Sequence, residues 1–157
     1  MDTIKLVKIK KNEIFKAWIL QRKGFKETLK KYQDYKTSPA TEGLISFYHK
    51  FTKQSIDNYW VINNGKTAGA LCIVTKPDCI WVGRFYILPE YRNKGIGQQA
   101  LLLAESLYPE SKRWCLDTIF EEKNNIHLYQ KIGYKEYGER KTINNKMTLI
   151  KFEKEIE

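Results

Sequence analysis

The first fifty residues alternate between apolar and polar positions in two ways. Residues 4–9 alternate weakly, as an edge strand does, and helical spacing begins after Asn12, a plausible helix cap, and runs to the break at Gly24. Ser38 followed by Pro39 can open a second helix, because proline fits the first turn. Its apolar stripe follows an i, i+3, i+4, i+7 pattern: Leu44, Phe47, Tyr48 and Phe51.

The pattern changes to extended segments rich in β-branched and aromatic residues. These segments are 59–62, 70–74 and 80–88. Short turn signals at 63–66 and 76–78 separate them. Because tight turns join antiparallel neighbours, the sequence predicts a three-stranded antiparallel meander.

The remainder of the chain returns to helical spacing before the last strands. A helix is predicted from about Ile96 to Tyr108, followed by a strand at 114–119. A strand, a crossover helix and a strand imply one parallel pair in a mixed sheet. A short helix near 124–132 and strands near 134–137 and 147–152 complete an α+β fold, a mostly antiparallel sheet flanked by about four helices.

Composition supports one folded domain that covers residues 1–157. The chain is 42% hydrophobic and contains 4 Trp, 10 Tyr and 7 Phe, which excludes disorder, collagen and a membrane bundle. No repeat or linker suggests a domain boundary. The three cysteines lack CxxC spacing and the two histidines lie far apart, so neither a disulfide framework nor a metal site is predicted. The N-terminus lacks an apolar leader and no run is long enough to cross a membrane, so we expect a cytoplasmic protein.

The net charge of +10 is concentrated near the N-terminus. Residues 1–36 contain 11 Lys and Arg against 4 Asp and Glu. A basic surface attracts any polyanion, so charge alone does not select a partner. Only 5 of the 28 cations are Arg, the residue favoured for reading bases. A nucleic-acid binder using Lys5, Lys8, Lys10, Lys11 and 23–31 is therefore an alternative, and no specific nucleic acid is expected.

The stretch 89–98 carries the most specific chemical signal. It lies between a predicted strand and a predicted helix and contains Arg92-x-x-Gly95-x-Gly97. Glycines let successive backbone N–H groups approach a ligand, and the helix directs its positive end to the same place. Arg92 and Lys94 add mobile positive charge. Such a loop is suited to phosphate, although P-loop and dinucleotide fingerprints are absent.

This loop resembles the Q/R-x-x-G-x-G/A signature of the GNAT (Gcn5-related N-acetyltransferase) superfamily, which binds the pyrophosphate of acetyl-CoA. A second segment, 124–134, is similar to the later L-Y-x-K-x-G-F/Y signature of that family. The element order over 58–152 agrees, whereas residues 1–57 match only in outline. The resemblance implies a GNAT-like acyl-CoA N-acyltransferase fold with the parallel pair at the cofactor cleft. It also makes acetyl-CoA the expected cosubstrate and a homodimer possible.

The resemblance assigns cofactor roles to two segments. The backbone of Phe85, Tyr86 and Ile87 would pair with the pantetheine arm. Backbone N–H groups of the loop would hold the pyrophosphate, and this set is Arg92, Asn93, Lys94, Gly95, Ile96, Gly97 and Gln98. Where the family often has a cofactor-binding Asn, this chain has Glu122. Either Asn124 replaces that Asn through a shifted helix start, or this cofactor contact is missing.

The resemblance also suggests catalytic residues. Tyr129 matches the Tyr that protonates the departing thiolate, with core packing as the alternative. Asp117 lies where some relatives have a catalytic Glu, on a strand face shared with Cys115 and Ile119, where burial would raise its pKa. An ordinary structural carboxylate is the alternative for Asp117. Glu42, Asp57 and Glu122 are further candidates for the base, and an ordered water is another.

The expected function is transfer of an acetyl group from acetyl-CoA to a primary amine by direct attack. A non-catalytic acyl-CoA-binding or regulatory module of the same fold is the alternative, because of Glu122. Tyr32 and Tyr35 are candidate substrate contacts, and His127 and the cysteines are expected to pack rather than react. The acceptor, whether small molecule or protein, is left open, although a mostly basic cleft would disfavour a cationic one.

Overall fold

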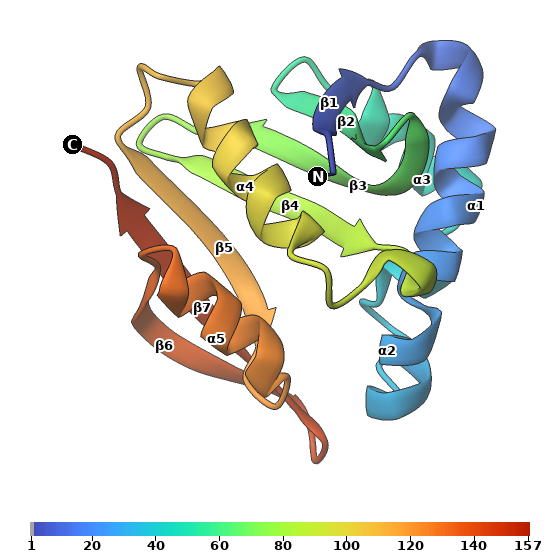
Figure 1. Cartoon of the computed structure of the whole chain (residues 1–157). Helices are drawn as coiled ribbons and strands as arrows, with labels where there is room; N and C mark the ends of the chain where they lie inside the picture. Colours follow the sequence, from blue (N-terminus) through green and yellow to red (C-terminus); the bar gives the residue numbers. More distant parts are fainter. Residues whose placement is uncertain (1) are drawn as a thin grey trace.

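A twisted seven-stranded sheet forms the centre of the molecule (Figure 1). The computed structural model describes residues 2–157. The strands are β1 Ile4–Lys8, β2 Ile56–Asn63, β3 Lys66–Thr75, β4 Ile80–Ile87, β5 Arg113–Ile119, β6 Lys135–Asn144 and β7 Met147–Glu155. The α-helices are α1 Ile14–Gly24, α2 Lys26–Tyr32, α3 Leu44–Phe51, α4 Ile96–Leu107 and α5 Lys123–Lys131.

Strand pairing confirms the predicted mixed topology. The order is β1-β2-β3-β4-β5-β7-β6, and all neighbours are antiparallel except β4 and β5. The meander at residues 56–87 and the single parallel pair were both predicted. The last strand, β7, inserts between β5 and β6, so the C-terminal hairpin extends the sheet beyond the crossover.

Two apolar layers cover the two faces of the sheet (Figure 1). On one face, α4 buries Ile96, Ala100 and Leu101 against strand residues such as Leu71 and Trp114. On the other face, α1 and α3 bury a second cluster, which includes Ile14, Ala17, Phe47, Phe51 and Tyr86. The periodicity in the sequence corresponds to these faces, although Leu44 and Tyr48 of the predicted α3 stripe are exposed.

The starts of two helices differ from the prediction. Asn12 lies inside a short 3₁₀ turn, Lys11–Glu13, and does not cap α1. The carboxylate of Glu13 accepts from the backbone N–H of Lys10 at 2.9 Å, so Glu13 organises this turn instead. Ser38 does cap, but it caps the 3₁₀ turn Pro39–Thr41, and α3 begins separately after Gly43.

A bulge separates the two arms of the sheet at β4. Leu71 of β3 pairs with Phe85 and Ile73 pairs with Val82, so two residues of β4 lie opposite Cys72. Parallel pairing with β5 is confined to residues 80–82 of β4. The remainder of β4, from Gly83 to Ile87, therefore diverges from β5 and leaves the sheet open.

Within residues 2–157, no helix is long and apolar enough to cross a membrane.

Candidate active site

A pocket of about 950 Å³ lies where β4 and β5 diverge. Its lining comes from both faces of the sheet. Phe85 and Tyr129 contribute from the side of α4 and α5, whereas Glu42, Arg84 and Asp117 belong to the opposite side. Strand divergence thus makes one cavity in which groups from both sides of the sheet can meet a single ligand.

The glycine loop has the geometry of an anion site next to this pocket. Gly95 has a φ of +77° and precedes the first residue of α4, and a Cβ placed on it would meet nothing within 4 Å. No side chain of residues 2–157 caps α4, so the first backbone N–H groups of this helix are left for a ligand. A Cβ on Gly97 would lie 3.7 Å from Phe85, which lines the pocket. The loop therefore adjoins the cavity without lining it.

Arg92 is not the mobile cation that the motif suggested. Its Nε donates to the carbonyl of Ile87 at 2.8 Å, and Nη2 donates to the carbonyl of Gly24 at 2.9 Å. Nη1 forms an ion pair with Glu27 at 2.7 Å. These contacts tie the loop to the ends of α1 and α2, so the prediction of a free guanidinium is wrong. Lys94 is exposed and has no such partner within residues 2–157.

The predicted pantetheine strand presents alternating side chains. Phe85 and Ile87 pack on the side of α4, and Tyr86 is buried on the other side against Phe25. The main-chain edge that faces β5 has no strand partner beyond Val82. Asn124 is exposed and does not line the pocket, whereas Asn125 does.

Tyr129 lies on α5 with its ring against the core and its side chain in the pocket lining. Its ring makes edge contacts with Tyr134 and Phe152 at centroid distances of 6.0 and 6.1 Å. Burial raises the pKa of Tyr129 to about 12. The hydroxyl is therefore protonated at neutral pH. The packing expected as the alternative for Tyr129 is present, and its place in the pocket lining leaves the role of proton donor as a proposal.

Asp117 lines the same pocket from β5. The surrounding protein removes part of the hydration of its carboxylate, which raises the pKa of Asp117 above its usual value. Charges on Lys151, Lys76 and Lys141 act in the opposite direction. The raised pKa agrees with the expectation from the sequence, although the side chain is open to the cavity rather than enclosed.

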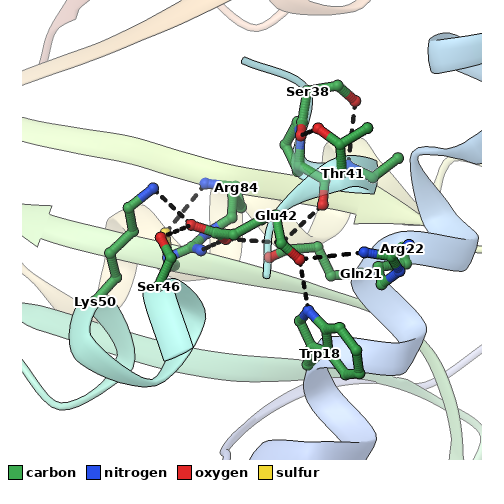
Figure 2. Close-up of polar contacts among 12 residues, drawn as sticks. Trp18, Gln21, Arg22, Ser38, Thr41, Glu42, Ser46, Lys50 and Arg84 are labelled. Atoms are coloured by element: carbon green, nitrogen blue, oxygen red, sulfur yellow. Dashed lines mark hydrogen bonds and ion pairs between the residues drawn. The ribbon is translucent and has the colours of Figure 1, made fainter. Parts of the chain in front are cut away.

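Glu42 is the most heavily bonded carboxylate of the pocket (Figure 2). Its Oε1 accepts from Arg84 at 2.8 Å and from Gln21 at 3.0 Å. Its Oε2 accepts from Ser46 at 2.9 Å and pairs with Lys50 at 2.7 Å. Burial alone would raise the pKa of Glu42, but these donors outweigh burial and hold it below the usual range. A carboxylate with four donors is a poor proton acceptor, so Glu42 is excluded as the base.

The backbone of Glu42 is held as firmly as its side chain. Its carbonyl accepts from the indole of Trp18 at 2.7 Å and from Arg22 at 3.3 Å, both on α1 (Figure 2). This cluster joins α1, α3 and β4 around one buried charge. Sequence reasoning named Glu42 only as a possible base and missed Gln21 and Arg84, because nothing local marks them as partners.

The other predicted residues are divided between the pocket and its surroundings. Asp57 accepts from Tyr108 at 2.6 Å and does not line the pocket, so it is excluded as the base. Glu122 does line it, and accepts from Tyr32 at 2.8 Å and Lys31 at 3.2 Å. Tyr32 is therefore a buried structural contact rather than a lining residue, whereas Tyr35 lines the pocket.

Comparison with known protein families identifies the family of this chain. Residues 55–136, just over half of the chain, match the family described as acetyltransferase (GNAT) domain. The chain belongs to the GNAT family. The matched range contains β4, the glycine loop, β5 and α5, which hold every proposed cofactor and catalytic residue. The uncharacterized protein YrkN of Bacillus subtilis strain 168 is 33% identical over 79 residues, 48% of this chain and 43% of YrkN.

Solved structures show the same GNAT fold over nearly the whole chain. The ribosomal-protein-S18-alanine N-acetyltransferase of Escherichia coli has a TM-score of 0.73 at 17% identity and covers 99% of this chain and 94% of its own. PaiA N-acetyltransferase of Thermoplasma acidophilum, solved with coenzyme A, has a TM-score of 0.70 at 18% identity, with coverage of 98% and 99%. Spermidine N-acetyltransferase of Vibrio cholerae, solved with CoA and spermine, has a TM-score of 0.74 at 13% identity, with coverage of 96% and 94%. At these identities the likeness establishes the fold, including the N-terminal helices that the sequence matched only in outline.

Proposed function

We propose that this GNAT protein transfers the acetyl group of acetyl-CoA directly to a primary amine. The observation that carries the proposal is the presence of Tyr129 and Asp117 in one pocket, beside an uncapped helix start preceded by Gly95. The loop would receive the pyrophosphate on backbone N–H groups. The open edge of β4 from Gly83 to Ile87 would pair with the amides of the pantetheine arm.

The reaction would need no covalent enzyme intermediate. The neutral amine attacks the thioester carbonyl, a C–N bond forms, and the C–S bond breaks to release the CoA thiolate. Tyr129, which burial keeps protonated, stabilises the thiolate by donating its hydroxyl and passes its proton to sulfur, and the tyrosinate then regains a proton from solvent. Asp117, or a water that it orients, removes the proton that the amine loses.

Release of CoA thiol from acetyl-CoA over a panel of amines tests this proposal. We expect turnover with some amines, and we expect Tyr129→Phe to lower kcat by about 100-fold, the size of a typical general-acid contribution. Tyr48→Phe is the matched control, since Tyr48 is exposed on α3 and does not line the pocket. An unchanged rate for Tyr129→Phe across the pH range would remove Tyr129 from the mechanism.

The alternative of a non-catalytic acyl-CoA-binding module rests on Glu122, whose carboxylate binds Tyr32 and Lys31 where the family often has an amide. Calorimetry with acetyl-CoA distinguishes the two proposals. Tight binding without thiol release from any amine would favour the binding module.

A further inference from the structure

The pocket contains equal numbers of acidic and basic side chains, but the two sets are not equally available. The acids are Asp34, Glu42, Asp117 and Glu122. Both oxygens of Asp34 accept hydrogen bonds from Thr37. Glu42 has four donors, and Glu122 is paired with Lys31. Within residues 2–157, Asp117 is the lining carboxylate that no hydrogen bond engages.

The cations of the pocket retain donors. Arg84 forms one guanidinium contact within residues 2–157, from Nη1 to Glu42, so its Nε and Nη2 N–H groups are left for a ligand. Its side chain is 15% exposed and lies over the ring of Phe47 at 5.2 Å, which fixes its plane. Lys50, half-exposed, uses its ammonium for Glu42 and has further N–H groups. The pair Arg84 and Lys50 carries two positive charges against the single charge of Glu42.

A third cation lies on the same side of the pocket. Lys76 is 4.3 Å from the ring of Trp81, and both residues line the pocket. If the acceptor carried a second ammonium group, Asp117 would be the lining carboxylate without a hydrogen bond that could bind it, and the proposed reaction needs Asp117 to take a proton. An oxyanion on the acceptor would find a buried guanidinium held by its carboxylate partner, which is the geometry that favours bidentate binding.

Resting on the proposed acetyltransferase function, we infer that the acceptor is an amine that also carries a carboxylate, as an amino acid does, with Arg84 and Lys50 binding that carboxylate while the amine points toward Asp117. The arrangement excludes polyamines by charge. It also assigns Arg84 and Lys50 to acceptor specificity and leaves acetyl-CoA to the loop at Gly95.

Matched acceptors test the inference. The proteinogenic amino acids and several ω-amino acids are assayed for thiol release from acetyl-CoA, and the best two are compared with their carboxamides, their decarboxylated amines and a diamine. We expect kcat/KM to be about tenfold or more higher for the acid than for the carboxamide, the size of one charge-assisted contact. This preference would run against chemical reactivity, because the carboxamide has the less basic amine and so more of its neutral form.

Lys50→Met should lower the ratio of acid to carboxamide kcat/KM toward one. Lys53→Met is the control, since Lys53 follows the same helix, is exposed, and does not line the pocket. A general loss of folding or activity changes both acceptors alike and leaves the ratio unaltered, so the ratio reports binding of the carboxylate. A ratio near one in the unmodified protein, or preference for the diamine, would overturn the inference while the acetyltransferase function stands.

Binding measurements separate the two proposals when no acceptor is turned over. Calorimetry of the best amino acid and its carboxamide is done on the full chain saturated with CoA. Binding that needs the carboxylate and weakens in Lys50→Met would support the acceptor class even though the proposed catalysis had failed. Equal binding of both compounds, or of neither, would overturn it.

Discussion

Replacing Glu42 by Gln keeps the shape of the side chain and removes the charge on which the α1–α3–β4 cluster depends. The Glu42 side chain is 8% exposed and Arg84 is 15% exposed, so both are desolvated in the folded protein. Removing one partner of a buried ion pair costs about 3–5 kcal/mol. Because Lys50 is half-exposed and can return to water, we expect the lower end, about 3 kcal/mol of unfolding free energy.

Urea denaturation measures this loss. With an m value of about 2 kcal/mol/M, typical for a small domain, the midpoint should fall by about 1.5 M at unchanged m. The Tm should fall by about 6–12 °C, since 1 kcal/mol shifts a domain of this size by about 2–4 °C. Glu110→Gln is the control, because Glu110 is exposed and has no partner within residues 2–157. A loss for Glu42→Gln below about 1 kcal/mol would refute the reasoning, since exposed pairs contribute that much.

The difference in stability between the unmodified protein and Glu42→Gln should depend on pH, because the pKa of Glu42 is lowered in the folded protein. A carboxyl with a depressed pKa stabilises the fold fully above its unfolded pKa of about 4.3, and the contribution is lost as pH falls through the folded value. The stability gap between the unmodified protein and Glu42→Gln should therefore be widest above about pH 5 and narrow on acidification. A gap that widens toward low pH would contradict the assignment.

Three other predictions concern the pocket, the loop and the sheet. In Asp117→Asn the fall of kcat/KM at low pH should disappear, because protonation of Asp117, whose pKa is raised, would cause that fall in the unmodified protein. If the fall is retained, another group causes it. Arg92→Met should lower the free energy of unfolding by about 1–3 kcal/mol, since it frees two backbone carbonyls and a carboxylate, whereas Lys94→Met should raise the KM for acetyl-CoA without lowering stability. Urea denaturation and the KM for acetyl-CoA are measured for both variants. If Arg92→Met raised the KM without lowering stability while Lys94→Met lowered stability, Arg92 would again be assigned as a mobile phosphate ligand. Gly69→Ala should cost on the order of 3 kcal/mol, because the new Cβ would lie 2.1 Å from a main-chain carbonyl of β4 and force a backbone shift. Gly43→Ala, whose Cβ would meet nothing within 4 Å, should cost less than about 1 kcal/mol in the same denaturation assay.

The periodic segments could be predicted because their apolar positions follow the element that they form: α4 buries one face, and the central strands have near-continuous apolar runs that are covered on both faces. The meander, α4 and β5 show strong apolar patterns over their whole length, and the structure places them within a few residues of the predicted bounds. The helix starts were predicted less well. A capping rule applied to Asn12 does not predict that the carboxylate of Glu13 accepts from the backbone N–H of Lys10, because several polar side chains compete for the same exposed N–H groups.

The residues of the candidate site likewise fall into two groups: those that a contiguous motif marks and those that only tertiary packing brings together. The glycine loop and Tyr129 lie in contiguous motifs, so the sequence itself marks them. The Glu42 cluster is assembled from residues distant in the chain, Gln21 on α1, Lys50 on α3 and Arg84 on β4, and each looks like an ordinary polar residue in its own segment. The expectation that the charge of Arg92 is mobile was wrong for the same reason, because its partners at Gly24 and Glu27 are brought to it only by tertiary packing.

The basic N-terminal segment, residues 1–36, has a structural use that the charge count alone did not reveal. Three of its lysines pair with acids that lie outside the segment: Lys8 with Asp57 at 3.4 Å, Lys23 with Glu90 at 3.9 Å, and Lys31 with Glu122 at 3.2 Å. Each pair is largely exposed, so each contributes only about 0–1 kcal/mol. Their positions matter more than their strength, because they join β1, α1 and α2 to β2, the turn after β4 and the start of α5. Part of the positive charge of this segment is thus paired with acids of the rest of the chain, while the whole chain keeps its net charge of +10.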